Sequence, residues 1–254
     1  MMKFRTFLFQ AAYWITSIFF GLMALPLLLI PGRKILMGWL FIYTKVMTFW
    51  MRVIAGIQIK IIGRDHVPAA PCIIAAKHQS WGDGFTMFSQ FYDLTCVVGD
   101  HLEKLPLVGH ILRKMGTIIV DNNGGSYARS KLVSEQLKKN TNMRRVLIYP
   151  EGHLSPVGQQ FRYRKGIYHM YRSYNCAVVP VATNLGLRWR QNTWELSPGE
   201  AVVEFLDPIA PGLNKKEFME RLEKTIESRS LALLGDEAPD DIELGATLPD
   251  PKDP

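Results

Sequence analysis

Residues 7–30 of the chain contain no charged residue, and about 20 consecutive apolar residues are enough for a helix to cross the hydrocarbon core of a bilayer. The pair Pro31-Gly32 then interrupts the run, and a second apolar stretch over residues 35–51 carries a single charge, Lys45. Proline followed by glycine is a strong helix breaker. Residues 1–53 are therefore predicted to form a hairpin of two apolar helices that associates with a membrane.

The basic residues of this segment leave the orientation of the hairpin open. Positive charge flanks both predicted helices at every end, at Lys3, Arg5, Arg33, Lys34 and Arg52. Because topology normally follows an excess of Lys and Arg on one side, this distribution selects none. Three arrangements remain: a hairpin that spans the bilayer, a hairpin that lies in one leaflet with its basic ends among cytosolic headgroups, and a buried helix pair in a soluble core. The charge-free length favours membrane attachment.

Beyond residue 54 the pattern changes to short apolar runs that alternate with segments of helical period. Such alternation is typical of an α/β domain with a mixed, mostly parallel sheet flanked by helices. We predict one such domain over residues 54–232. Its expected strands are 57–62, 72–76, 95–98, 117–120, 146–149, 177–182 and 201–205, and its expected helices are 103–115, 126–139, 166–174 and 215–234.

Charge is unevenly distributed along the chain. The net charge is +7, but residues 231–254 hold seven acidic residues and one lysine, which leaves +13 on the rest. A basic body indicates an anionic partner, such as nucleic acid, a membrane surface or a phosphorylated substrate. From residue 233 onward Pro, Asp and Gly dominate with little to bury, so residues 233–254 are predicted to be an acidic disordered tail.

The three cysteines, Cys72, Cys96 and Cys176, are scattered, and each lies in or beside an apolar run. This is typical of small core residues in a reducing compartment. The chain contains no CxxC motif or paired Cys/His spacing. We therefore expect neither a disulfide nor a metal site.

His78 and Asp83 follow directly after the expected strand 72–76. Gly82 and Gly84 flank Asp83 and are expected to let the backbone turn, so that the carboxylate folds back onto the imidazole. A carboxylate on one ring nitrogen fixes the tautomer and raises the basicity of the other nitrogen, which can then take a proton from a hydroxyl group. The simpler alternatives are a helix N-cap at Asp83 and a surface histidine in a loop.

Polar residues also follow two other expected strands. Asp121 and Asn122 come after one strand, where an ordinary Asn-Gly turn is the simpler interpretation. Glu151 and Gly152 come after another, at the kind of strand end where open α/β sheets bind ligands. A solvated glutamate in a turn is the alternative for Glu151.

Basic and aromatic residues alternate shortly afterwards, in Phe161-Arg162-Tyr163-Arg164-Lys165. Such a segment can bind a phosphate, a lipid headgroup or a nucleotide, and a solvated basic loop is the alternative. Further on, Val179-Pro180-Val181 places a proline in a strand, which predicts a sheet edge or a bulge because proline cannot donate a backbone hydrogen bond.

Taken in order, these motifs resemble the lysophosphatidic acid acyltransferase family (1-acylglycerol-3-phosphate O-acyltransferases) of bacteria, over about residues 52–230. The family's first motif, a histidine, four residues and an aspartate, matches His78 to Asp83. Its second matches residues 116–122 in part, its third matches Pro150-Glu151-Gly152, and its fourth matches Val179-Pro180-Val181. The resemblance implies a glycerolipid acyltransferase-like fold and a membrane-associated N-terminal helix pair.

Two positions depart from the family pattern. Asn122 and Leu154 stand where the resemblance predicts arginines that bind the phosphate of the acceptor. Arg129, Arg162, Arg164 or Lys165 are candidates to replace them, and an acceptor without a phosphate is the other possibility. The resemblance otherwise implies that Asp121, Asn122, Glu151 and Gly152 contribute to substrate binding.

The implied reaction is the transfer of an acyl group from acyl-CoA or acyl carrier protein to the free hydroxyl of 1-acyl-glycerol-3-phosphate, which gives phosphatidic acid for phospholipid synthesis. His78 is expected to act as the general base and Asp83 to orient it, without an acyl-enzyme, a metal or a further cofactor. Backbone N–H groups near Gly82 or Gly152 are expected to stabilise the oxyanion. The implied location is the cytoplasmic face of the inner membrane.

Competing functions remain at this point. Within the acyltransferases, the acceptor can be another lysolipid, such as a lyso-ornithine lipid or a lysophospholipid. A thioester hydrolase would share much of the same chemistry. A basic membrane-anchored binding protein without catalysis is the alternative of another class, although the basic and aromatic residues cluster in one loop instead of covering a face, which argues against nucleic acid.

Overall fold

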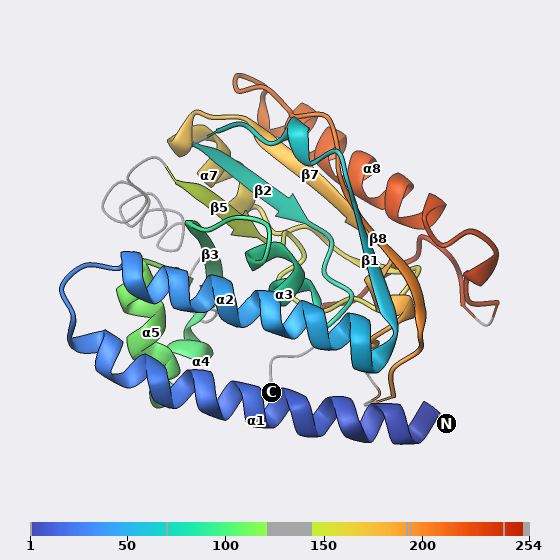
Figure 1. Cartoon of the computed structure of the whole chain (residues 1–254). Coiled ribbons are helices and arrows are strands. Elements are labelled where there is room, and N and C mark those ends of the chain that lie inside the picture. Colours follow the sequence, from blue (N-terminus) through green and yellow to red (C-terminus); the bar gives the residue numbers. More distant parts are fainter. Residues whose placement is uncertain are drawn as a thin grey trace.

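The N-terminal segment forms the predicted helical hairpin in a computed structural model that describes residues 2–69, 71–120, 144–191, 193, 195–240 and 242–250. Helix α1 (Met2–Leu29) and helix α2 (Lys34–Trp50) run side by side (Figure 1), and a π-helical turn, η1 (Met51–Ala55), leads into the domain. The Pro31-Gly32 break lies between the two helices, as the sequence predicts.

A seven-stranded sheet forms the centre of the domain, and it is parallel except between β7 and β8. The strand order is β1-β8-β7-β2-β5-β3-β4. Each expected strand is present: β1 (Ile57–Ile62), β2 (Cys72–Ala76), β3 (Leu94–Gly99), β4 (Ile118–Val120), β5 (Arg145–Ile148), β7 (Val178–Thr183) and β8 (Gly199–Phe205). The predicted mixed, mostly parallel α/β architecture is confirmed.

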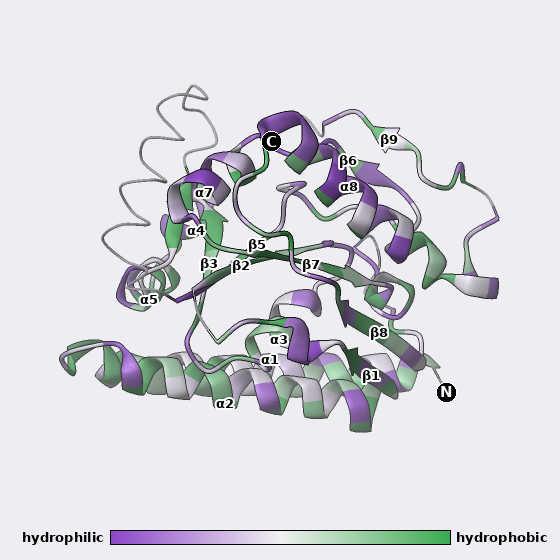
Figure 2. Ribbon diagram, turned by 90° about the horizontal axis from the view of Figure 1, so that it is seen from above, coloured by the Kyte–Doolittle hydropathy of each residue, from purple (hydrophilic) through white to green (hydrophobic). Residues whose placement is uncertain are grey.

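Helices cover both faces of the sheet (Figures 1 and 2). One face carries α7 (Gly166–Tyr174) and α8 (Lys215–Ala232), and the other carries α3 (Asp83–Phe88) and the hairpin. The expected helix 103–115 is two pieces, α4 (Asp100–Glu103) and α5 (Val108–Met115). The expected helix 126–139 lies outside the described residues.

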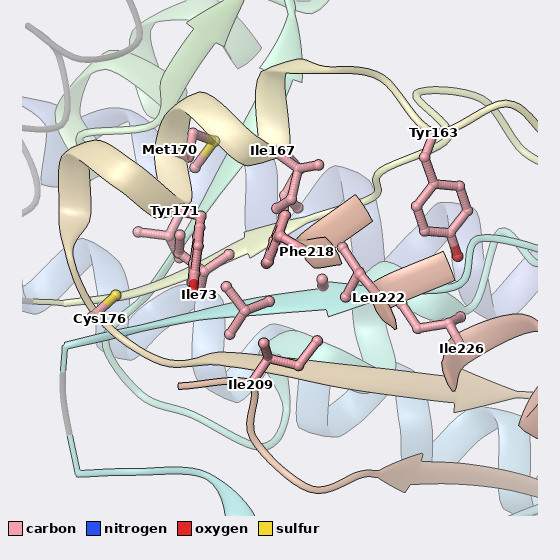
Figure 3. Packing of buried hydrophobic residues seen from close by; sticks show 14 of the residues in the cluster. Ile73, Tyr163, Ile167, Met170, Tyr171, Cys176, Ile209, Phe218, Leu222 and Ile226 are labelled. Atoms are coloured by element: carbon pink, nitrogen blue, oxygen red, sulfur yellow. The ribbon is translucent and has the colours of Figure 1, made fainter. Parts of the chain in front are cut away.

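Strand β2 is buried along its whole length, because its neighbours are strands and both of its faces are covered. Its side chains alternate: Ile73 and Ala75 pack with α7 and α8 (Figure 3), and Cys72, Ile74 and Ala76 pack toward α3. Each buried isoleucine contributes about 1.5–3 kcal/mol relative to an exposed one. The strand is therefore a firm support for the residues that follow it. The three cysteines are free and buried, as predicted.

Pro180 lies in a central strand, between β8 and β2, and not at the sheet edge. Val181 pairs with Phe205 and Val178 pairs with Ile209. The two pairs are three residues apart along β7 but four residues apart in the segment that includes the end of β8. This extra residue is a bulge. The sequence allowed either a sheet edge or a bulge at Pro180, and the structure shows the bulge.

One face of the hairpin packs on the domain, and the other is exposed. Near the start of α1, Phe9 is buried and its ring contacts Trp189 at 5.2 Å; near its end, Ala24 packs with Leu36 and Met115. The apolar residues that remain exposed on α1 include Phe4, Phe7, Leu8, Trp14, Ile15, Ile18, Phe19, Leu22, Met23, Leu25 and Leu29. The hairpin lies along the outside of the molecule (Figure 2), and the exposure of these side chains contradicts the alternative of a buried helix pair.

The segment after α8 has a defined path over residues 233–250, apart from residue 241, whereas the sequence predicts a disordered tail there. Leu234 is buried against Val157 and Leu187. Strand β9 (Thr247–Leu248) pairs with β6 (Gln160–Phe161), and Glu237 hydrogen-bonds Arg188. The composition of this segment indicated little to bury, but it obtains its apolar and charged partners from distant parts of the chain.

Candidate active site

His78 follows β2 directly and faces Asp83, the first residue of α3. His78 Nδ1 lies 2.9 Å from Asp83 Oδ2, and the histidine side chain is 22% exposed. Because the carboxylate accepts the proton on Nδ1, Nε2 is the nitrogen left to exchange a proton with a substrate. The contact that the sequence predicted is therefore present.

The position of Asp83 is fixed by the backbone that it faces. Its Oδ2 atom accepts hydrogen bonds from the N–H groups of Gln79 at 2.8 Å and Ser80 at 2.9 Å, in addition to His78. The carboxylate thus binds the turn that carries the histidine and does not cap the first turn of α3. The N-cap alternative does not describe this geometry.

Gly82 lies at a close packing contact, and its backbone conformation does not need a glycine. Its φ angle is −76°, which any residue adopts. A Cβ atom at Gly82 would lie 2.8 Å from Met51 Cε and 3.2 Å from both Leu185 Cδ2 and Trp189 Cε3. The explanation predicted from the sequence is therefore wrong for Gly82: the glycine lets the His78–Asp83 turn lie directly against the end of the hairpin.

Tyr149 packs against one face of the imidazole ring of His78. Its ring stacks on His78 with centroids 3.9 Å apart and an interplanar angle of 14°. Burial, and secondarily the charge of Asp83, raises the pKa of Tyr149 well above its usual value. The phenol therefore stays neutral, and stacking restricts the ring of His78 to one plane.

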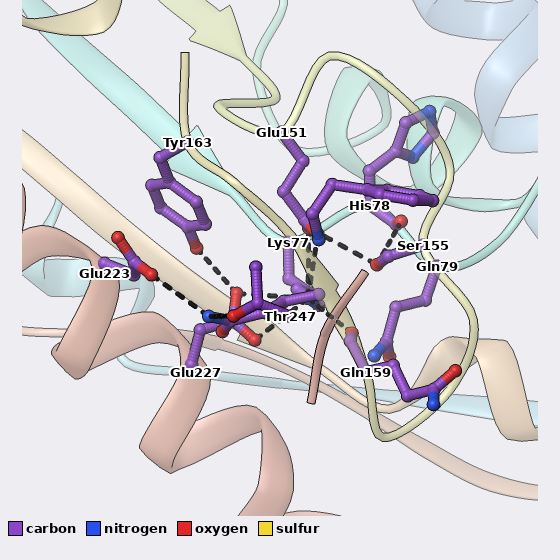
Figure 4. Close-up of polar contacts among 12 residues, drawn as sticks. Lys77, His78, Gln79, Glu151, Ser155, Gln159, Tyr163, Glu223, Glu227 and Thr247 are labelled. Atoms are coloured by element: carbon purple, nitrogen blue, oxygen red, sulfur yellow. Dashed lines mark hydrogen bonds and ion pairs between the residues drawn. The ribbon is translucent and has the colours of Figure 1, made fainter. Parts of the chain in front are cut away.

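Glu151 is fully buried, and this differs from the substrate-facing position expected for it. Its carboxylate lies 3.1 Å from Lys77 Nζ and accepts a hydrogen bond of 2.7 Å from the N–H of Phe161 (Figure 4). A direct contact with a substrate would require this network to open. Gly152, which follows, is exposed with φ at +77°, a left-handed conformation that favours glycine.

The predicted basic loop presents Arg162, Arg164 and Lys165 to solvent, while its aromatic residues point inward. Arg164 lies beside Gly152: it hydrogen-bonds His153 at 3.0 Å and pairs with Asp250 at 3.3 Å. Asp121, Asn122 and Arg129 lie outside the described residues.

A pocket of about 300 Å³ adjoins the His78–Asp83 turn. Its lining comes from four separate segments of the chain: Gln79, Ser155, Pro156, Val157, Arg190, Gln191, Thr193, Pro239 and Ile242. Gln79 is 2% exposed, and its carboxamide oxygen has no hydrogen-bond partner. Sequence reasoning did not select Gln79 or Arg190, although Gln79 stands next to His78. No cluster of three or more metal-ligating side chains occurs within the described residues.

Comparison with known proteins places this geometry in a family. The family model described as Acyltransferase matches residues 58–184, half of the chain. The chain belongs to the acyltransferase family. The matched residues of this acyltransferase-family chain include His78, Asp83, Glu151 and Gly152, so the resemblance predicted from the motifs is confirmed.

Two relatives agree with this assignment, and one solved structure shares the fold. A 1-acyl-sn-glycerol-3-phosphate acyltransferase of Pseudomonas aeruginosa is 33% identical over 154 residues, which cover 59% of this chain and 59% of that protein. The Saccharomyces cerevisiae protein of the same name is 27% identical over 214 residues, or 81% of this chain and 69% of that protein. The crystal structure of the 1-acyl-sn-glycerophosphate (LPA) acyltransferase PlsC from Thermotoga maritima shares the fold, with a TM-score of 0.74 at 18% identity over 92% of this chain and 98% of that one.

Proposed function

We propose that this protein transfers an acyl group from an acyl thioester to the free hydroxyl of 1-acyl-glycerol-3-phosphate, with phosphatidic acid as the product. One observation carries the proposal: His78 Nδ1 is 2.9 Å from an Asp83 carboxylate that two backbone N–H groups also hold. The names of the relatives supply the substrate class. The match to the Pseudomonas protein covers 59% of its length.

In the proposed mechanism, His78 Nε2 removes the proton from the acceptor hydroxyl as its oxygen attacks the thioester carbonyl. The C–O bond forms, the C–S bond breaks, and the leaving thiolate takes the proton from the imidazolium. Asp83 keeps the Nδ1–H of His78 in place and stabilises the imidazolium between the two proton transfers. His78 is a base and not a nucleophile in this scheme.

Backbone N–H groups near Gly82 or Gly152 remain the candidates for the oxyanion, but the N–H groups of these two glycines already have acceptors. The Gly82 N–H already donates to Ser80 Oγ at 3.0 Å, and the Gly152 N–H donates to the carbonyl of Tyr149 at 3.0 Å. Both N–H groups are therefore already engaged in hydrogen bonds within tight turns. A transition state would therefore have to recruit other groups.

Two arginines are our candidates for the acceptor's phosphate. Arg190 lines the pocket next to the His78–Asp83 turn, and Arg164 lies over Gly152, where its present partners are His153 and the exposed Asp250. A phosphate dianion is a stronger partner for a guanidinium than an exposed carboxylate is. These side chains would take the place of the arginines that are absent at positions 122 and 154.

The exposed hairpin face supports a membrane location. Among the described residues, α1 is the one helix long and apolar enough to cross a bilayer. Only 6% of its most apolar 18-residue stretch is buried. Both ends of α1 contact the domain, through Phe9 near the start and through Lys114, which hydrogen-bonds the carbonyl of Leu28 at 2.8 Å. A spanning hairpin would have to leave these contacts. We therefore propose that it lies in one leaflet, on the cytoplasmic face of the inner membrane.

The test is an acceptor panel with purified protein in lipid vesicles. One labelled acyl-CoA and the matching acyl carrier protein thioester are offered with 1-acyl-glycerol-3-phosphate, lyso-ornithine lipid, a lysophospholipid or no acceptor. Labelled phosphatidic acid as the main product supports the proposal. Preference for another lysolipid would identify that lysolipid as the acceptor in place of 1-acyl-glycerol-3-phosphate. Thioester loss that is independent of acceptor would identify a hydrolase. An absence of turnover with every pair would favour a binding protein.

Turnover with one thioester and not the other identifies the donor. Replacement of Arg164 or Arg190 by Gln should raise the KM for 1-acyl-glycerol-3-phosphate. Unchanged kinetics in both variants would contradict the assignment of the phosphate site.

A further inference from the structure

A buried charge network lies behind the catalytic turn and reaches α8 (Figure 4). Lys77, the residue before His78, has a side chain that is 0% exposed. Its ammonium group lies 3.1 Å from Glu151, 2.9 Å from the carbonyl of Gln159, and 3.0 and 2.9 Å from the two carboxylate oxygens of Glu227. An ammonium group has three protons, and these three residues use them all.

The network holds the backbone of His78 on both sides. On the N-terminal side, Lys77 is fixed by its side-chain partners and by its N–H, which donates to the carbonyl of Val181 at 3.0 Å. On the C-terminal side, the carbonyl of His78 accepts the N–H of Ser155 at 2.7 Å. The Ser155 hydroxyl lies 3.1 Å from that carbonyl and 3.3 Å from Glu151.

The network contains one carboxylate more than the ammonium group needs as a charge partner. Two carboxylates face one ammonium, with side-chain exposures of 1% for Glu151, 12% for Glu227 and 0% for Lys77. Lys77 and Glu151 would form a neutral pair without Glu227. A second buried carboxylate is therefore not needed to neutralise the lysine, and its desolvation costs stability. This excess favours a role for Glu227 beyond charge balance.

We propose that Glu227 is a positioning residue for acyl transfer, which acts through Lys77 and Glu151 to hold His78 in its reactive place. Glu227 comes from α8, outside the residues that the family model matches. Tyr163 holds Glu227 in turn through a hydrogen bond of 2.8 Å from its hydroxyl. The proposal rests on the proposed function only in taking His78 as the base.

The experiment compares Glu227→Gln and Glu227→Ala with a control on the same helix, Glu220→Gln. Glu220 is exposed, so the control removes the same charge without touching the network. We expect kcat to fall about tenfold in Glu227→Gln and further in Glu227→Ala, because a displaced catalytic group reacts more slowly. The KM values for acceptor and thioester should stay within about twofold, because a positioning residue acts through Lys77 and not on the substrates.

Rates are measured per folded molecule, below the unfolding midpoint of each variant. Equal kcat in Glu227→Gln and Glu220→Gln would overturn the proposal. So would a loss that only follows the fraction of unfolded protein, or a loss confined to KM. Inactivity of the wild-type protein toward every acceptor would instead count against the proposed function, which separates the two failures.

Discussion

At the scale of single residues, the candidate site depends on close packing around one turn. One carboxylate oxygen of Asp83 accepts three hydrogen bonds, one of them from His78. The ring of Tyr149 stacks on the imidazole of His78. Gly82 lets this turn approach Met51 and Trp189 of other elements. The orientation of His78 therefore depends on Tyr149 and Gly82 as well as on Asp83.

Substitution of Gly82 by Ala should destabilise the protein by about 1–3 kcal/mol, the usual cost of overpacking. Its Cβ would lie 2.8 Å from Met51 Cε. Gly84→Ala is the matched control, since a Cβ there meets nothing within 4 Å and the position is helical. That change should be neutral or stabilising by up to about 1 kcal/mol. Urea unfolding of both variants measures the difference, and equal midpoints would contradict the packing argument.

The stability of the protein should depend on pH through Glu151. Burial raises the pKa of Glu151 from its ordinary 4.5 to about 7, against the opposing effect of Lys77 and with the help of Glu227. A carboxyl group with a raised pKa stabilises the folded state below pH 4.5, and this contribution is lost as the pH rises through 7. Wild-type protein should therefore lose stability relative to Glu151→Gln between pH 5 and pH 8. Parallel stability curves for the two proteins would exclude this linkage.

At the scale of elements, the strands could be predicted and their partners could not. Ile57–Ile62 and Cys72–Ala76 agree with the sequence because apolar β-branched residues between breakers are a local signal. The partners of Lys77 are 74 and 150 residues away in the chain, so no local pattern reveals that this lysine is buried. The same limit explains why Glu151 was expected to face a substrate. The proximity of His78 and Asp83 was predictable because only four residues separate them.

The C-terminal segment offers a direct test at this scale. Gly245 donates its N–H to the carbonyl of Gly158 at 2.7 Å, and Gln160 donates to the carbonyl of Ala246 at 3.0 Å. The amides of Gly245 and Gln160 should therefore exchange with solvent more slowly than in an unstructured chain. Hydrogen exchange followed by NMR measures both. If the amide of Gly245 exchanged at the rate of an unstructured chain, the sequence-based prediction of a disordered tail would be supported instead.

At the scale of the whole molecule, the protein combines a basic α/β domain with an apolar layer on one side. The net charge is +7, and the exposed face of the hairpin carries large apolar side chains. Anionic lipid would attract the body over about a Debye length, and the apolar face would then insert. A lysolipid could thus keep its chain in the bilayer while its headgroup enters the site.

Replacement of Ile15, Ile18 and Phe19 by Ser should weaken binding to anionic vesicles about 100-fold or more, since each exposed side chain would bury apolar surface in the lipid. These residues lie on one side of α1 at helical spacing. Leu244→Ser, which changes an exposed leucine on the C-terminal segment, is the control and should bind as the wild type does. Flotation with vesicles measures binding, and unchanged binding of the triple variant would contradict the one-leaflet placement.

The general-base role of His78 is the claim on which the account depends, and the kcat of His78→Ala in vesicles with 1-acyl-glycerol-3-phosphate tests it most directly. His110→Ala, at an exposed position on α5, is the control. The account predicts a loss in kcat on the order of 10²-fold or more for His78→Ala, as expected when a general base is removed, with little change in the control. A His78→Ala enzyme that turns over at the rate of the control would contradict the account.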